Sequence, residues 1–219
     1  MRPMAAPVVL SLALAGSAAA GEIHGVARLA GAAPPPAPLE VTKDRATCGE
    51  EVPDESVAAA DGRLRNVVVV VKGGPRPAPG KVTLDQRRCR YAPHVQAAAL
   101  GSTLEIVNGD PLLHNVHGYL GQSTAFNVAM PTRNQGIPRK LEKPGVVVVR
   151  CDVHAWMSAY VLVTDSPFAV TGDDGTFSVG GLAPGSYTVT AWHERLGERT
   201  ATVTVPPAGG AQVDFTFAR

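Results

Sequence analysis

The stretch Val146-Val147-Val148-Val149-Arg150-Cys151-Asp152-Val153-His154-Ala155-Trp156-Met157 joins a β-strand run to a group of possible metal ligands. A second run, Tyr160-Val161-Leu162-Val163, follows almost directly. Short apolar runs rich in valine are typical of buried strands. We therefore expect a tight turn between two strands, in which the thiol of Cys151, the imidazole of His154 and the thioether of Met157 share one end of a sheet.

These three donors are the soft and borderline ligands that copper prefers, and a trigonal copper site adds a second imidazole to them. The segment 110–117, which contains His114 and His117, offers that imidazole. The turn alone also fits a simpler interpretation, in which Cys151 is half of a disulfide, His154 lies on the surface and Met157 belongs to the core.

The chain has three cysteines, an odd number for an exported protein. Cys48 and Cys89 can pair, which leaves Cys151 as the thiol. Only Cys151 has a histidine and a methionine beside it, so this division is favoured. A bridge from Cys48 would also anchor the long polar segment 40–62. A disulfide that includes Cys151, and intermolecular pairing of the odd cysteine, remain open.

The first residues, 1–20, have the pattern of a secretory signal peptide. Arg2 precedes a short apolar run, and Ala18-Ala19-Ala20 provides small residues before a cleavage point at Gly21. The prediction is a periplasmic or otherwise exported protein without a membrane span after cleavage, and the alternative is an uncleaved anchor. The formal net charge of +1 gives no argument for a nucleic acid or an anionic membrane as partner.

Residues 89–163 resemble a cupredoxin of the plastocyanin/amicyanin type. The motifs that carry the resemblance are Tyr91-Ala92-Pro93, Gly101, the strand 104–108 ending in Asn108, the segment 110–117 with His114-Asn115-Val116-His117, Pro144-Gly145, and Cys151 with His154 and Met157. The resemblance implies one copper ion per chain, cycling between Cu(I) and Cu(II). It makes His114, Cys151 and His154 the strong ligands and Met157 the weak axial ligand. Asn115 would join the ligand loops, and His117 would not be a ligand.

Residues 170–205 resemble the second half of a carboxypeptidase regulatory-like (transthyretin-like) domain. The motifs are Thr171 to Phe177, Leu182 to Tyr187 and Val189-Thr190-Ala191. The opening strands of such a domain are missing before Pro167, but 23–26 and 66–71 match them far upstream. We therefore expect a cupredoxin-like domain, 80–165, inserted into a regulatory-like sandwich made of 21–79 and 166–219. Exported bacterial proteins with this combination are sometimes labelled methylamine-utilisation proteins.

The predicted fold class is all-β, with a Greek-key cupredoxin β-sandwich and a small Ig/transthyretin-like β-sandwich. The 23 glycines and 19 prolines that punctuate the valine-rich runs agree with this class. Residues 120–140 are expected to be rich in loops. Two further donors stay open: His94 is either a fourth ligand or a surface or hydrogen-bonded histidine, and Met130 competes with Met157. His193-Glu194 is set aside as a zinc motif because residue 197 is not histidine.

The predicted function is one-electron transfer between redox proteins by a monomer that is not an enzyme, because the sequence offers no acid–base pair. The partner is expected to dock over Leu112, Leu113, Ala155 and Trp156, with His154 on an exposed turn as the exit for the electron. Two alternatives remain: copper binding and delivery without a redox partner, and a metal-free structural or interaction module.

Overall fold

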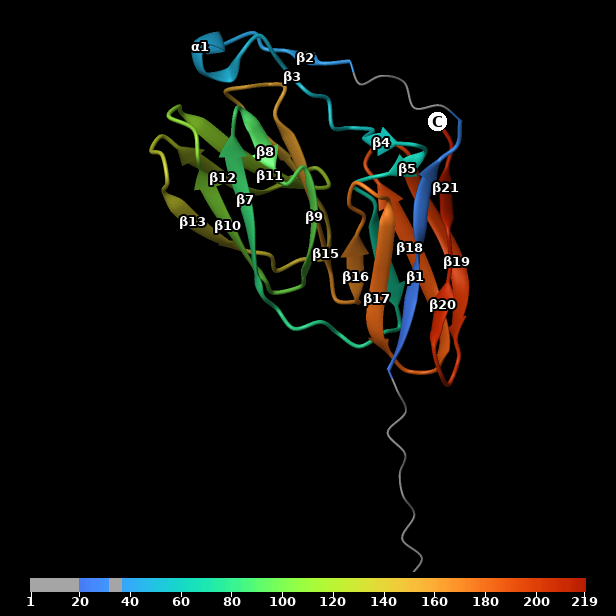
Figure 1. The fold of residues 1–219 in the computed structure, drawn as a ribbon. Helices are drawn as coiled ribbons and strands as arrows, with labels where there is room; N and C mark the ends of the chain where they lie inside the picture. The colour runs from blue at the N-terminus through green and yellow to red at the C-terminus, as the bar shows by residue number, and fades with distance from the viewer. Residues whose placement is uncertain (1–19, 32–36) are drawn as a thin grey trace, which may run out of the picture.

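The computed structural model describes residues 20–31 and 37–219, and the predicted signal peptide lies outside these residues except for Ala20. The described chain is almost entirely β-structure and forms two β-sandwiches side by side (Figure 1). The prediction of an all-β protein built from two sandwiches is confirmed. Within the described residues, no helix has the length and apolar character needed to cross a bilayer.

The first sandwich contains Cys151 and packs two sheets around one core. One sheet has the order β12-β11-β14-β15-β9 and the other β13-β10-β7-β8. Most neighbours are antiparallel, but β9 runs parallel to β15 and β7 runs parallel to β10. The strands are β7 (Lys81–Arg87), β8 (Arg90–Ala92), β9 (Val95–Ala99), β10 (Thr103–Asn108), β11 (His114–Leu120), β12 (Ser123–Met130), β13 (Gly136–Lys140), β14 (Gly145–Arg150) and β15 (Ser158–Thr164).

Alternation along the strands explains this core. In β10, Leu104, Ile106 and Asn108 are buried on one face, as the sequence predicts. The expectation of loops over 120–140 is wrong, because β12 and β13 occupy most of that range. In β12 only every second residue is buried, from Phe126 to Met130. β13 is an edge strand with no buried residue. Such strands lack a continuous apolar run, so their signal in the sequence is weak.

The second sandwich is built around β1 (Gly21–Leu29). β1 pairs with β17 (Thr176–Leu182) in antiparallel register, with His24 opposite Ser178, and it pairs with no strand of the first sandwich. Its sheet also contains β4 (Ala59–Ala60), β5 (Arg63–Leu64), β20 (Gly210–Gln212) and β21 (Phe215–Phe217). The facing sheet has the order β16-β6-β18-β19, with β6 (Val68–Lys72), β16 (Phe168–Val170), β18 (Gly185–His193) and β19 (Gly197–Val205).

β6 is buried on both faces because the two sandwiches meet on it. Val69 and Val71 belong to the core of the second sandwich. Val68 and Val70 face the other way and pack with Leu162 and its neighbours in β9 and β15 of the first sandwich. The run 66–71, predicted as a strand buried on both faces, thus serves two packing layers. Its strand begins only at Val68, since Asn66 has a left-handed backbone with φ of 64°.

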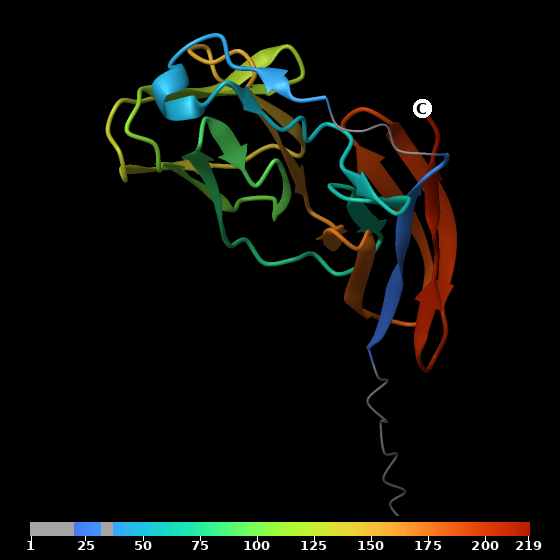
Figure 2. The ribbon, with the colours of Figure 1, turned by 45° about the horizontal axis from the view of Figure 1, so that its top comes forward.

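A segment between β1 and β4 crosses to the first sandwich and covers one end of it. This covering segment, residues 39–52, contains β2 (Leu39–Glu40), α1 (Arg45–Cys48) and β3 (Glu51–Val52). Figures 1 and 2 show α1 at the end of the sandwich that also carries β8. Val41, Cys48 and Val52 are buried in the core of the first sandwich. The range 21–79, assigned from the sequence to the second sandwich, therefore includes a segment that packs on the first.

Gly25 in β1 provides a test of how tightly the second sandwich is packed. A Cβ atom at Gly25 would lie 1.7 Å from the carbonyl oxygen of Val213, so the backbone would have to move. We expect Gly25→Ala to lower the free energy of unfolding by about 3 kcal/mol. Gly180→Ala in the neighbouring β17 is the matched control, because a Cβ atom there meets nothing within 4 Å. Urea unfolding of both variants measures the difference, and equal stability would contradict this account of the packing.

Candidate metal centre

Three elements bring the predicted strong ligands together. His114 is the first residue of β11, Cys151 follows the last residue of β14, and His154 lies in the turn that leads to β15. β11 and β14 are neighbours in one sheet, so the start of one strand lies beside the end of the other. His114 and His154 are fully buried and Cys151 is nearly so. The structure leaves Cys151 as a free thiol and joins Cys48 to Cys89 in a disulfide, with the two Cα atoms 5.3 Å apart.

The donor atoms converge on one small space. The Nδ1 atoms of His114 and His154 are 2.9 Å apart, and the Sγ atom of Cys151 is 3.9 Å from Nδ1 of His154. The three donor atoms all lie within 4.8 Å of one another. Two imidazoles and a thiol in a buried cluster of this size match the strong donors of a trigonal copper site.

Two carboxylates, which the sequence analysis did not identify, hold the far side of each imidazole. Nε2 of His114 is 3.0 Å from Oδ2 of Asp110, and Nε2 of His154 is 2.9 Å from Oδ2 of Asp44. A carboxylate accepts a hydrogen from Nε2, which leaves Nδ1 of a neutral imidazole with its lone pair free. Burial lowers the pKa of His114, against the opposing effect of Asp110. In these tautomers both Nδ1 lone pairs point into the same space, an arrangement that a bound cation stabilises.

The sequence held a signal for only one of these carboxylates. Asp110 lies four residues before His114, in the loop already suspected of supplying a ligand. Asp44 lies 110 positions before His154 and precedes α1 in the covering segment. Only the tertiary fold brings Asp44 to the site, so no local pattern could have identified it.

Asn115 connects the two ligand-bearing segments. Its side-chain nitrogen donates to Oδ2 of Asp152 at 2.8 Å, and its side-chain oxygen accepts from the backbone N–H of Asp152 at 2.5 Å. The hydroxyl of Tyr91 donates to the carbonyl oxygens of both Asn115 and Arg150. Burial raises the pKa of Tyr91 far above its usual range, so it stays a neutral donor. These contacts fix His114 relative to Cys151 before any metal binds.

His117 lies outside the donor cluster. Its Nδ1 is 3.1 Å from Oδ2 of Asp152 and its Nε2 is 3.0 Å from the hydroxyl of Thr124. Burial acts to raise the pKa of Asp152, but hydrogen bonds from Asn115 and His117 outweigh it and hold that pKa below its usual range. His117 therefore supports the loop that follows Cys151.

Both methionines considered from the sequence are buried near the ligands. Met157 lies in the same core as Cys151, and its backbone N–H donates to the carbonyl oxygen of His154 at 3.0 Å. Met130 is paired with His114 across β11 and β12. The backbone thus places a methionine beside each histidine, and the assignment of Met157 as the axial donor stays a prediction.

The expectation that His154 offers an exposed edge on its turn is wrong, although Asp152 and Ala155 of that turn are exposed. Asp44 of the covering segment contacts its Nε2 edge, and the ring of Trp156 lies 5.0 Å from the imidazole ring between centroids. The indole N–H of Trp156 donates to the carbonyl oxygen of Cys89 at 3.0 Å, which holds the indole against the bridged cysteine. His154 is fully buried. In this arrangement a partner cannot contact the imidazole directly.

His94 does not join the donor cluster. Its Nε2 forms a short contact with Glu194, and its Nδ1 is 3.1 Å from the carbonyl oxygen of Ser158. His94 belongs to the first sandwich and Glu194 to the second, and both side chains are buried. Of the two interpretations of His94, the structure shows the hydrogen-bonded one, as a polar link between the sandwiches.

His193 provides a test of pH dependence beside this link. Burial lowers the pKa of His193 to about 4, and its Nδ1 accepts the backbone N–H of Arg195 at 3.2 Å. The unfolded chain takes up a proton at this histidine near pH 6.5, whereas the folded chain does so only near pH 4. The stability that the neutral, buried imidazole contributes is therefore fully present above pH 6.5 and is lost as the pH falls towards 4. We expect a loss of about 3 kcal/mol in unfolding free energy over that range. His193→Asn should remove this component in urea titrations at several pH values, and an unchanged pH profile would contradict it.

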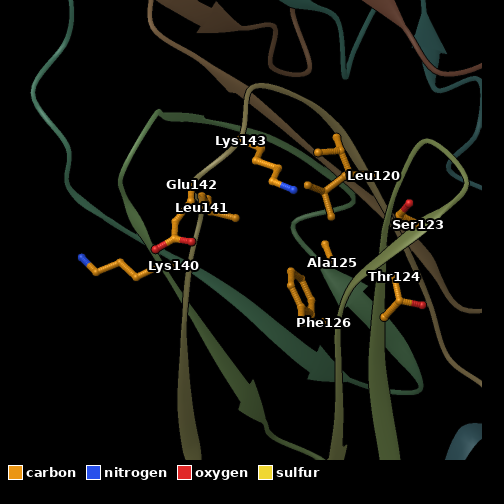
Figure 3. Close-up of a pocket in the computed structure, with 10 residues that line it drawn as sticks. Leu120, Ser123, Thr124, Ala125, Phe126, Lys140, Leu141, Glu142 and Lys143 are labelled. Atoms are coloured by element: carbon orange, nitrogen blue, oxygen red, sulfur yellow. The ribbon is translucent and has the colours of Figure 1, made fainter.

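A hollow of about 340 Å³ lies at the other end of β11 from the ligands. Figure 3 shows its lining, with the ring of Phe126 and the side chain of Leu120 on one side and Lys143 reaching towards them. None of the predicted ligands lines it, so it has no part in the metal centre.

Comparison with known proteins gives one family match and several structural similarities. The family model of the carboxypeptidase regulatory-like domain matches residues 147–218, less than half of the chain. The match includes β16 to β21 and starts within β14, which pairs with strands of the first sandwich. No curated protein matches the chain.

Three solved structures illustrate the structural similarities. A copper-containing nitrite reductase from Thermus scotoductus has a TM-score of 0.34 at 20% identity, covering 49% of this chain and 25% of that chain. A reduced mutant of amicyanin has a TM-score of 0.35 at 19% identity, covering 44% of this chain and 98% of that chain. A purple cupredoxin from Nitrosopumilus maritimus has a TM-score of 0.32 at 16% identity, covering 38% of this chain and 99% of that chain. The chain thus spans about a quarter of the nitrite reductase, and the fold assignment rests on the strand pairings described above.

Proposed function

We propose that the protein is a type 1 copper protein that carries single electrons between redox partners, with His114, Cys151 and His154 as the strong ligands and Met157 as the axial ligand. The observation that supports this most is the pair of Nδ1 atoms 2.9 Å apart beside the thiol of Cys151. Each imidazole is already turned towards the shared space by a carboxylate on its Nε2 side.

A bound copper ion would supply the one-electron couple between Cu(I) and Cu(II). The residues of the chain hold the donors in one geometry and exclude water. The three donors are buried, Asn115 ties the ligand segments together, and Trp156 and Asp44 cover the His154 side. Donors that are fixed in this way rearrange little when the charge of the metal changes, and little rearrangement is what fast electron transfer requires.

Burial favours electron transfer over copper delivery. A protein that passes on its metal needs access to the ligands, whereas here the covering segment is tied across the site by the disulfide between Cys48 and Cys89. Cyclic voltammetry of the copper-loaded protein and the rate of copper loss to an excess of chelator separate the two functions. We expect a reversible one-electron wave and copper loss over hours. Rapid loss without a reversible wave would instead favour delivery, and a protein that binds no copper would favour a structural module.

We also propose where the copper domain lies in the chain and that the protein is exported. Residues 80–165 form the copper domain, inserted into a regulatory-like sandwich that β1 opens and β16 to β21 complete. We propose an exported, monomeric protein without enzymatic activity of its own. N-terminal sequencing of the secreted protein tests export, and a first residue other than Gly21 would contradict the predicted cleavage.

A further inference from the structure

A groove rich in arginine lies beside the metal centre on the side of His114. Its volume is about 740 Å³, and its described lining has five arginines and two carboxylates, Glu55 and Asp110. The arginines come from both sandwiches: Arg65 follows β5, and the others belong to the β7–β8 region and to the connection before β13. They are Arg65, Arg87, Arg88, Arg90 and Arg133. A chain of net charge +1 therefore concentrates positive charge at this groove.

Part of this charge is available to a partner. Arg87 pairs with Asp85, Arg90 with Glu55, and Arg65 with Glu55 and Asp173. Arg88 and Arg133 are exposed, and neither is ion-paired with a carboxylate of the described residues. Nε of Arg133 donates to the carbonyl oxygen of Gly109 at 2.9 Å, which holds its guanidinium at the groove.

Asp110 connects the groove to the predicted metal ligands. It accepts the backbone N–H groups of Arg88 and Cys89 at 2.7 and 2.8 Å, and it holds Nε2 of His114 at 3.0 Å. One carboxylate and one hydrogen bond therefore separate the imidazole of His114 from the groove. The covering segment and Trp156 close the edge of His154.

We propose that an acidic protein surface docks in this groove and that the electron passes through His114 and Asp110 instead of through His154. This inference rests on the proposed function, because it names the partner of the same site. The groove is open and far larger than an inorganic anion, which favours a protein over a small ion. The described residues of its lining include no exposed aromatic side chain for stacking bases, since Tyr91 is buried, which disfavours a nucleic acid.

The first test uses the copper-free protein, so it does not depend on the redox function. We expect a hexaglutamate peptide to bind the wild-type protein at low salt and to bind the Arg88→Gln/Arg133→Gln double variant about tenfold more weakly. Arg139→Gln/Lys140→Gln removes two positive charges from β13, outside the groove, and should bind the peptide as the wild type does. Three outcomes would overturn the proposal. They are an equal loss of peptide affinity in both double variants, displacement of the peptide by inorganic phosphate at equal concentration, and tighter binding of an oligothymidylate than of the peptide.

The second test uses the reduced, copper-loaded protein and two small oxidants of opposite charge. Hexacyanoferrate(III) takes one electron to become hexacyanoferrate(II), and tris(phenanthroline)cobalt(III) takes one electron to become the cobalt(II) complex. We expect the groove variant to react about tenfold more slowly with the anionic oxidant and no more slowly with the cationic one. Equal slowing with both oxidants would overturn the inference. If the wild type forms no copper–thiolate site, the proposed function fails, and the peptide experiment still decides whether the groove binds acidic surfaces.

Discussion

Replacing both Cys48 and Cys89 with serine is expected to lower the free energy of unfolding of the copper-free protein by about 4 kcal/mol. The disulfide joins residues 41 positions apart, so its removal gives the unfolded chain many more conformations. Its removal also takes away the covalent link between α1 and the first sandwich, beside Asp44, the partner of His154. Urea unfolding followed by tryptophan fluorescence measures the loss.

Reduction of the wild-type protein provides the control for this prediction. A dithiol reductant should destabilise the wild type by about the same amount and should leave the Cys48→Ser/Cys89→Ser variant unchanged. If the variant unfolds at the same urea concentration as the oxidised wild type, the bridge does not hold the covering segment in place.

Asp110→Asn is expected to weaken copper binding about 10- to 100-fold, the usual cost of losing a carboxylate behind a metal-binding histidine. The neutral amide no longer favours the tautomer of His114 that carries its hydrogen on Nε2. Asparagine also has one side-chain oxygen instead of two, so it cannot accept both backbone N–H groups, of Arg88 and Cys89, as the carboxylate does. Competition with a chelator of known affinity measures the change.

The matched control is Asp165→Asn, at an exposed carboxylate that follows the last residue of β15, at the opposite end of that strand from the ligand turn. It should bind copper as the wild type does. Unfolding curves of the copper-free variants show whether Asp110→Asn is folded, so that a weaker affinity is not confused with a lost structure. Unchanged affinity in folded Asp110→Asn would show that Asp110 does not orient His114.

Local patterns predicted the parts of the fold that depend on apolar runs. The valine run 66–71 became a strand that is buried from Val68 to Val71, and the run 146–149 became part of β14, where Val147 and Val149 are buried. The alternation of 104–108 placed Leu104 and Ile106 in the core. The strands of 120–140 were missed because an edge strand such as β13 buries too little to show a periodic pattern. The sequence motifs, through their resemblance to cupredoxins, also named the three donors that the structure brings into one cluster.

What the sequence could not provide were contacts between distant segments. The covering segment reads as a polar loop, yet Val41 and Val52 enter the core of a sandwich formed by residues that come later in the chain. That placement brings Asp44 to His154 and buries a histidine that was expected to be exposed. The arginines of the groove are likewise spread from Arg65 to Arg133, so their charge becomes visible as one surface only in the folded protein.

The central claim is that Cys151 is a thiolate ligand of a copper ion held by His114 and His154. Its most direct test is the visible absorption and electron paramagnetic resonance spectrum after one equivalent of Cu(II) is added to the mature protein. The account predicts an intense thiolate-to-copper band with small hyperfine splitting, and the loss of that band in Cys151→Ser. A colourless wild-type protein, or a Cys151→Ser variant with the same spectrum as the wild type, would contradict it.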